Sequence, residues 1–245
     1  MREPRLVRIA ENASSLARIA ADCFLTTATE TVRHKGAFFV ALSGGSTPRD
    51  MYRLLPQRPY RTAVPWDHLH LFWVDERCVP HADRASNFGT TRRDFLKAVD
   101  IPPEQVHPMP TNPGSDEAAL AYEKVLKETV PLNRNGMPSL DMAFLGVGRD
   151  GHTASLFPCH AALREYTRWV VPLRGGTPCV DRFTLTLPVL NSAEHVVFLV
   201  SGIHKASVIK RIFKKSRTPS LPAQHVEPVN GRVIWLLDEE AASRL

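Results

Sequence analysis

Asp150 and His152 form the pattern with the clearest chemical potential, because they lie two positions apart in the glycine-rich stretch LGVGRDGHTASLF, residues 145–157. Imidazole titrates near neutral pH, so a histidine beside an aspartate at the end of a strand is a candidate general base. Gly148 and Gly151 favour a sharp turn that would present both side chains at its tip. A lone histidine in a turn is more often a cap or a spectator. The pair therefore indicates catalysis only in combination with other reactive groups.

A second glycine-rich turn, SGGSTP at residues 43–48, combines backbone freedom with hydroxyl groups. Gly44 and Gly45 would let the chain turn sharply and approach a ligand closely. Ser46 or Thr47 could cap a following helix, whose free N–H groups form a binding site for an anion. The segment is neither a Walker A loop nor a dinucleotide fingerprint. On its own it fits an ordinary strand-to-helix turn as well as a phosphate-binding turn.

Three basic residues, Arg77, Arg182 and Lys205, lie at the ends or starts of apolar runs. Arg77 shares the segment DERCVP with Asp75, which is a possible further member of the site. A polar loop with an internal ion pair explains this segment equally well, but an arginine there could also bind a phosphate or a developing oxyanion. Each basic residue taken singly is more typical of a structural role. Together they predict a small anionic substrate.

The segments that must position these residues are five apolar runs, each followed by a glycine-rich or acidic turn. The runs are residues 37–42, 69–74, 142–147, 195–200 and 232–237. Apolar runs without polar alternation are typical of strands covered on both faces, and their alternation with helices predicts a parallel sheet. Ligands of such open sheets bind beyond the carboxyl ends of the strands. We therefore expect the turns, including DER at 75–77, to form one site at that edge.

Helix-like segments follow most of these turns, and two further helices are expected elsewhere. The segments are residues 49–55, 152–157, 205–213 and 238–245, and the further helices cover 13–32 and 116–130. Ser115 can cap the start of the last helix, and Pro131 marks its end. The alternating segment RFTLTLP, residues 182–188, predicts a half-exposed or edge strand. No convincing linker divides the chain, so we expect one α/β domain over residues 1–245, with a mainly parallel sheet flanked by helices.

The composition indicates a soluble globular protein and disfavours a membrane protein, a metalloprotein and a nucleic-acid-binding protein. The chain has 245 residues, of which 43% are hydrophobic, as is ordinary for a soluble globular protein. No apolar run approaches the roughly 18–20 residues of a membrane span, and the N-terminal residues resemble neither a signal nor a transit peptide, so we expect a cytoplasmic protein. No group of histidine, cysteine or acidic residues has metal-ligand spacing. The net charge of +6 could attract nucleic acid, but the basic run 210–217 is more typical of a solvated helix face and loop.

These pieces, in this order, resemble the 6-phosphogluconolactonase family. The matching segments are SGGSTP, FWVDERCVP, SNFG, LGVGRDGHTASLFP, RFTLTLPVLN, SGIHKA and VIWLLDEEAA, which together cover residues 38–242. The resemblance implies hydrolysis of 6-phospho-D-glucono-1,5-lactone to 6-phosphogluconate, the second step of the oxidative pentose phosphate pathway. It also implies a fold shared with glucosamine-6-phosphate deaminases and ribose-5-phosphate isomerases, no metal or other cofactor, and a monomer.

The resemblance further implies roles for particular residues. His152 would be the base that activates water, with Asp150 in the same catalytic loop. Arg77, Arg182 and Lys205, together with the turn formed by Gly44, Gly45, Ser46 and Thr47, would hold the substrate. It remains open which basic residue meets the phosphate and which meets the carbonyl oxygen, and whether Asp150 orients His152 or holds the loop.

Two departures and three alternatives accompany this interpretation. Arg149 and Cys159 differ from common family residues, and Arg149 could alter the electrostatics of the loop. The deaminase branch carries a glutamate where this chain has Phe157, and loss of that carboxylate disfavours deaminase or isomerase activity. A non-catalytic sugar-phosphate sensor or a nucleic-acid binder would not need the Asp150–His152 pair. No nucleic-acid or membrane partner is expected.

Overall fold

A six-stranded parallel sheet forms the centre of the structure, and the five predicted apolar runs form five of its strands. The computed structural model describes residues 5–112, 115–214 and 221–245. The strands lie in the order β1-β9-β8-β5-β2-β3, and every neighbouring pair is parallel. Their bounds are β1 Leu6–Ala10, β2 Phe38–Leu42, β3 Leu69–Trp73, β5 Met142–Leu145, β8 His195–Val200 and β9 Arg232–Asp238. The order places β8, β5 and β2 side by side, so the turns that follow these three strands are neighbours.

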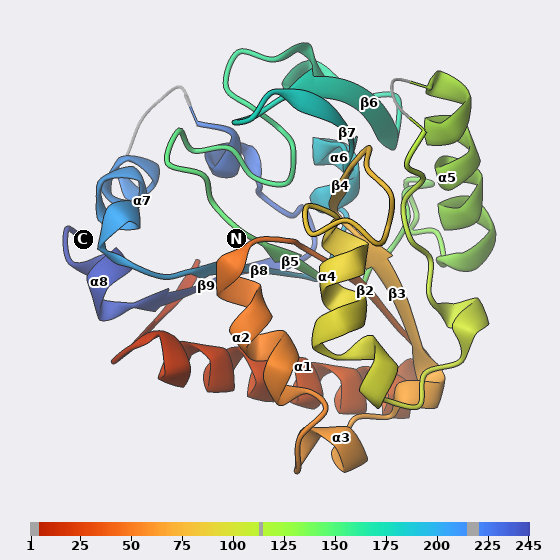
Figure 1. The fold of residues 1–245 in the computed structure, drawn as a ribbon, viewed down its shortest axis with the longest axis horizontal. Helices are drawn as coiled ribbons and strands as arrows, with labels where there is room; N and C mark the ends of the chain where they lie inside the picture. Colours follow the sequence, from red (N-terminus) through yellow and green to blue (C-terminus); the bar gives the residue numbers. More distant parts are fainter. Residues whose placement is uncertain (1–4, 113–114, 215–220) are drawn as a thin grey trace.

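Helices cover the sheet, and a small second sheet lies across it from α1 (Figure 1). The α-helices are α1 Ala13–Lys35, α2 Ser46–Leu54, α3 Tyr60–Ala63, α4 Asn87–Asp94, α5 Asp116–Thr129, α6 Leu187–Leu190, α7 Ala206–Phe213 and α8 Glu239–Ala242. Short 3-10 helices occupy Trp66–His68, Leu96–Ala98, Pro103–Gln105, Ala161–Arg164, Ile203–Lys205 and Pro222–His225. The two long predicted helices are confirmed. Ser115 caps α5 by accepting a hydrogen bond from the Ala118 N–H at 3.1 Å.

The second sheet corrects two predictions. It is antiparallel, in the order β4-β7-β6, with β4 at Asp75–Arg77, β7 at Val180–Leu185 and β6 at Val170–Gly175. The segment DER is therefore a strand and not a turn. Nor is the alternating segment half-exposed or at an edge, because β7 is the middle strand and Arg182, Phe183, Thr184 and Leu185 are all buried. Its polar residues alternate because they face other polar groups inside the protein.

The helix-like segment expected at 152–157 is wrong. The chain there forms turns and an isolated bridge between Thr153 and Leu156, and Ala154 has a positive φ of 48°. The hydroxyl of Thr153 donates to the Gly146 carbonyl at 2.9 Å, and the hydroxyl of Ser155 donates to a carboxylate on β4. Side chains that bond to other segments compete with helix formation. These bonds hold residues 153–155 as a fixed loop instead.

Candidate active site

The predicted site residues come together at a cavity of about 230 Å³ beyond the carboxyl ends of β2, β5 and β8. Those that line it are Gly44, Gly45, Ser46, Thr47, Asp75, Arg77, His152, Arg182 and Lys205. Asp150 stands just behind this lining, in contact with His152. The three neighbouring turns supply most of these groups, and strands β4 and β7 add two arginines, Arg77 and Arg182, which are direct partners in the strand register.

Asp150 and His152 form a hydrogen-bonded pair. The Nδ1 atom of His152 lies 2.6 Å from Oδ1 of Asp150, and the His152 backbone N–H donates to the same oxygen at 3.2 Å. Burial alone would raise the pKa of Asp150, but the hydrogen bonds and charge of His152 outweigh it and lower that pKa below its usual value. A carboxylate bound at Nδ1 leaves Nε2 as the nitrogen that can exchange a proton with a ligand. The geometry therefore favours an orienting role for Asp150.

Gly148 creates the space in which this pair lies. A Cβ atom added there would stand 2.1 Å from Nδ1 of His152 and 2.5 Å from Oδ1 of Asp150. The backbone closes the turn through hydrogen bonds from Gly148 N to the His152 carbonyl and from Gly151 N to the Gly148 carbonyl. Gly151, with φ of 90°, occupies the left-handed region that favours glycine. Gly148 is thus required for space, whereas Gly151 is required both for its backbone conformation and because a Cβ atom there would lie 2.9 Å from Cβ of Leu221.

The SGGSTP turn leads into α2 without a side-chain cap. Gly45, with φ of 100°, is the N-cap residue, so the expected capping by Ser46 or Thr47 is wrong. Ser46 and Thr47, the first two residues of the helix, line the cavity, and the first N–H groups of a helix have no partner within it, an arrangement that suits an anion. Gly44 has no room for a side chain, because a Cβ there would lie 1.8 Å from Oδ1 of Asn87.

The basic residues at the cavity are held mainly by carbonyl groups. Arg77 donates to the Ala85 carbonyl at 2.6 Å, and Lys205 donates to the Val147 carbonyl at 2.5 Å. Within the described residues, neither forms a salt bridge, whereas Arg182 lies 4.0 Å from a carboxylate oxygen of Asp75. Burial lowers the pKa of Lys205, and the charge of the exposed Arg149 lowers it further. Uncompensated positive charge around a small cavity attracts an anionic ligand.

Asp75 acts as a buried junction between four segments. Its Oδ2 accepts a hydrogen bond from Ser155 Oγ at 2.6 Å, and its Oδ1 accepts one from Asn87 Nδ2 at 3.1 Å. Nη1 of Arg182 lies 3.4 Å from the same Ser155 hydroxyl, while its Nε donates to the Gly175 carbonyl at 3.0 Å. Asp75 is only 7% exposed. Its position ties β4 to α4, to the loop after His152 and to β7.

Sequence reasoning missed several residues that organise the site. Glu76 is fully buried and accepts hydrogen bonds from Ser86 Oγ and from the backbone N–H groups of residues 77, 87 and 88. Asp238 accepts bonds from Ser201 Oγ and Gly202 N, and so fixes the turn before Lys205. Their signal in the sequence is weak, because an acid after a strand usually stays in solvent. His204, next to Lys205, also lines the cavity and was not singled out.

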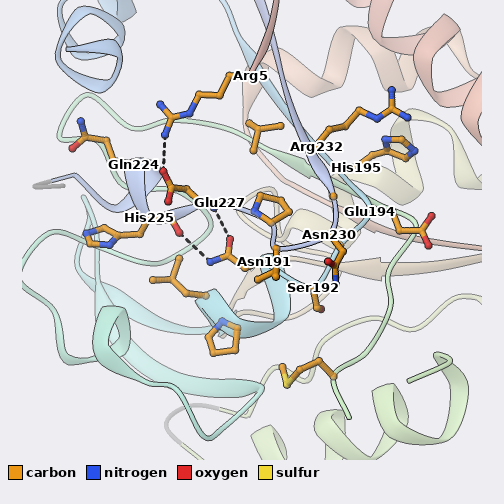
Figure 2. A pocket seen from close by; sticks show the side chains of 18 of the residues that line it. Arg5, Asn191, Ser192, Glu194, His195, Gln224, His225, Glu227, Asn230 and Arg232 are labelled. Carbon is orange, nitrogen blue, oxygen red and sulfur yellow. Dashed lines mark hydrogen bonds and ion pairs between the residues drawn. The ribbon is translucent and has the colours of Figure 1, made fainter. Parts of the chain in front are cut away.

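A larger cavity, of about 1490 Å³, lies at the opposite end of the sheet (Figure 2). His195 and Arg232, the first residues of β8 and β9, border it. Arg5 bonds to Glu227 at 3.1 Å, and Asn191 bonds to the backbone of residues 225 and 227, whereas Nδ1 of His195 is buried with no hydrogen-bond partner among the described residues. None of the predicted site residues reaches it, since they all gather at the carboxyl ends of the strands.

Comparison with known proteins agrees with this geometry. The family model described as glucosamine-6-phosphate isomerases/6-phosphogluconolactonase matches residues 11–235. A 6-phosphogluconolactonase from Synechocystis sp. is 39% identical over 226 residues, which cover 91% of each chain. The chain belongs to the glucosamine-6-phosphate isomerase/6-phosphogluconolactonase family. The 6-phosphogluconolactonase of Trypanosoma brucei has the same fold, with a TM-score of 0.89 at 27% identity and 99% of each chain covered.

The same family fold also appears in a monomeric glucosamine-6-phosphate deaminase, with a TM-score of 0.82 at 22% identity over 98% of this chain. That level of identity relates the folds only. No helix among the described residues is both long and apolar enough to cross a membrane. Nor do those residues include three or more histidine, cysteine or acidic side chains grouped so as to hold a metal ion. Of the basic run, Lys210 and Arg211 are exposed in the last turn of α7 and Lys214 is exposed directly after it, and residues 215–217 lie outside the described residues.

Proposed function

We propose that this chain hydrolyses 6-phospho-D-glucono-1,5-lactone to 6-phosphogluconate. One observation carries the proposal: an oriented His152–Asp150 pair faces a cavity whose other charged groups are mainly cations. A lactone is an activated ester, so its hydrolysis needs a base for water and donors for the developing oxyanion. The names of the relatives from Synechocystis sp. and T. brucei support the same substrate.

The reaction follows from the positions of these groups. Nε2 of neutral His152 takes a proton from water as the oxygen attacks the lactone carbonyl carbon. Arg77 or Arg182 stabilises the negative charge that develops on the carbonyl oxygen. When the tetrahedral intermediate collapses, the bond to the ring oxygen breaks and His152 returns the proton to that oxygen. The carboxylic acid product then releases a proton to solvent. Asp150 holds the imidazole in the orientation and tautomer that this sequence requires.

Phosphate recognition is the second part of the proposal. The open N-terminus of α2, its hydroxyls Ser46 and Thr47, and Lys205 surround the same cavity. Each charge-assisted hydrogen bond contributes about 1.5–3 kcal/mol. Two such bonds, if both are made to the phosphate, predict that kcat/KM for the phosphorylated lactone exceeds that for gluconolactone by at least about 10²-fold.

The deciding experiment measures acid release from both lactones by the purified chain, corrected for spontaneous hydrolysis. Rapid, His152-dependent turnover of the phosphorylated lactone is the expected result, and His152→Asn is the matched inactive control. Equal kcat/KM for the two lactones would refute phosphate recognition. Ammonium release from glucosamine 6-phosphate would instead support the deaminase alternative, which the apolar Phe157 disfavours.

The remaining parts of the proposal concern domain organisation, oligomeric state, cellular location, metal dependence and nucleic-acid binding. We infer that residues 1–245 form one domain that acts as a monomer in the cytoplasm, without metal and without a nucleic-acid partner. The positive charge at the cavity supports a small anionic substrate in place of a polymer. Light scattering tests the monomer. Activity in EDTA tests metal independence, and salt dependence of binding to DNA or RNA tests the exclusion of nucleic acid, because such binding weakens steeply with salt.

A further inference from the structure

Phe157 contacts two proposed site groups at once. Its ring centroid lies 4.8 Å from that of His152, with the planes tilted by 52°. The guanidinium carbon of Arg182 lies over the same ring, 5.5 Å from its centroid. Phe157 is buried, with 8% of its surface exposed. A single rigid side chain thus joins the His152 loop to the buried arginine on β7.

Two glycines fix the place of this ring. A Cβ atom at Gly175 would lie 2.8 Å from Cδ2 of Phe157, and one at Gly176 would lie 3.2 Å from its Cζ. Both glycines lie where β6 ends, at the hairpin that leads into β7. The ring therefore packs directly on backbone, which moves less than side chains do. Because the ring also contacts His152, it fixes the position of the imidazole relative to the small sheet.

His152 needs this contact because its hydrogen bonds alone do not fix the orientation of the imidazole ring. The bond from Nδ1 to Asp150 fixes one point of the imidazole but does not fix its tilt about that bond. Across the described residues, Nε2 makes no hydrogen bond to the protein, and the side chain is 34% exposed. Contact with a buried aromatic ring supplies the second constraint. General-base catalysis depends on such constraints, because a misplacement of about 1 Å can cost on the order of 10²-fold in rate.

The guanidinium of Arg182 also needs the aromatic ring of Phe157, but for a different reason. Its side chain is almost wholly buried, so its charge has lost most of its water, and its neighbours are Asp75, Ser155 and the Gly175 carbonyl. A desolvated guanidinium over an aromatic face is stabilised by the negative charge density of the ring. Removal of the ring would open space in which the guanidinium could shift.

We propose that Phe157 is a positioning residue that sets the distance and orientation between the imidazole of His152 and the guanidinium of Arg182. The catalytic part of this inference rests on the proposed lactonase activity. The base for the water, His152, and one of the two arginines proposed as donors to the carbonyl oxygen, Arg182, would then share one rigid spacer. Replacement of the ring should loosen both groups together.

The first test compares Phe157→Leu and Phe157→Ala with Phe24→Leu, a matched control in the core beneath the sheet. We expect kcat to fall by about 10-fold in Phe157→Leu and by on the order of 10²-fold in Phe157→Ala, while Phe24→Leu changes melting temperature but not kcat. In the His152→Asn background, Phe157→Leu should lower kcat by a smaller factor than it does in wild type, because only its effect through Arg182 remains. A Phe157→Leu enzyme within twofold of wild-type kcat would overturn the inference, even if Phe157→Ala does not fold.

The second test does not depend on activity. The Hε1 proton of His152, assigned from its loss in His152→Asn, should have an NMR shift displaced by the ring current of Phe157. Phe157→Leu should move this resonance, and Phe24→Leu should leave it in place. An unchanged resonance would show that the two rings are not in contact in solution and would overturn the proposal. A moved resonance in a protein without lactonase activity would instead refute the proposed function and leave the contact intact.

Discussion

Gly148→Ala gives the sharpest test of the His152–Asp150 pair, because it adds one methyl group at the point where the pair lies. Gly148 is not among the glycines with positive φ, so alanine fits its backbone without strain. The added Cβ would stand 2.1 Å from Nδ1 of His152, where ordinary contact begins at 3.4 Å. The imidazole must therefore retreat by about 1.3 Å from its place, according to these two distances. Asp150, at 2.5 Å, must move with it.

A displacement of this size has a predictable effect on rate. Misplacement of a reacting group by about 1 Å can cost on the order of 10²-fold, which corresponds to about 2.7 kcal/mol of transition-state free energy. Both displaced side chains are partly exposed and can swing into solvent, so the melting temperature should change little. The groups proposed to bind the phosphate lie on other turns, so KM should rise less than kcat falls.

The assay is initial-rate hydrolysis of the phosphorylated lactone by wild type, Gly148→Ala, His152→Asn and the double variant. If Gly148→Ala acts through His152, the methyl group should have no further effect once the base is gone, and the two mutations will be strongly non-additive. Additive losses would show that Gly148 matters for another reason. Wild-type kcat in a folded Gly148→Ala protein would refute the role assigned to the pair.

Three further predictions address the base, the phosphate site and stability. His152→Asn should lower kcat by about 10²–10⁴-fold with little change in melting temperature, as expected for loss of a general base. Lys205→Ala should raise KM by about 10-fold or more, from the loss of a charge-assisted bond, with a smaller effect on kcat. Burial, together with the charge of His70, lowers the pKa of His107 from 6.5 to about 4. The unfolded chain therefore takes up more protons than the folded one between these values, and stability should fall as pH drops from about 6.5 toward 4. His107→Phe keeps the ring stack on Phe72 but has no group that takes up this proton. Its melting temperature should therefore fall less between pH 7 and pH 5 than that of wild type, and melting curves at the two pH values measure the difference.

Local patterns were sufficient to predict the main sheet and the neighbourhood of the site. Apolar runs identified five of its six strands, because strands covered on both faces leave a strong compositional signal. The strand that was missed, β1, is a short edge strand with exposed Leu6 and Ile9, and its sequence LVRIA alternates too little to stand out. Glycine-rich turns identified most of the cavity lining, since these turns lie beyond adjacent parallel strands.

The second sheet could not be predicted in the same way, because its polar side chains are buried through long-range pairing. Thr184 on β7 accepts a hydrogen bond from the Ser155 N–H at 3.2 Å, and no local pattern shows that a loop 29 residues away will cover it. The same applies to DER, which becomes a strand only because β7 lies beside it. A strand with alternating polar residues has one face in solvent only if no polar segment of the protein packs on that face.

The sequence was sufficient to locate the site but not to assign a role to each of its residues, and the buried acids Asp75 and Glu76 show why. Asp75 and Glu76 are adjacent in sequence and both buried, yet Asp75 borders the cavity and bonds to Ser155 and Asn87, whereas Glu76 bonds to the Ser86 hydroxyl and to the backbone N–H groups of residues 77, 87 and 88. A burial cost of this kind is offset only when every carboxylate oxygen has donors, and those donors come from segments distant in the chain. Asp75, with its oxygens bound to Ser155 and Asn87, is therefore poorly placed to replace His152 as a base. Its geometry suits a junction that keeps Arg182 and the catalytic loop at a fixed separation, and this leaves Nε2 of His152 as the proton acceptor that the cavity best supports.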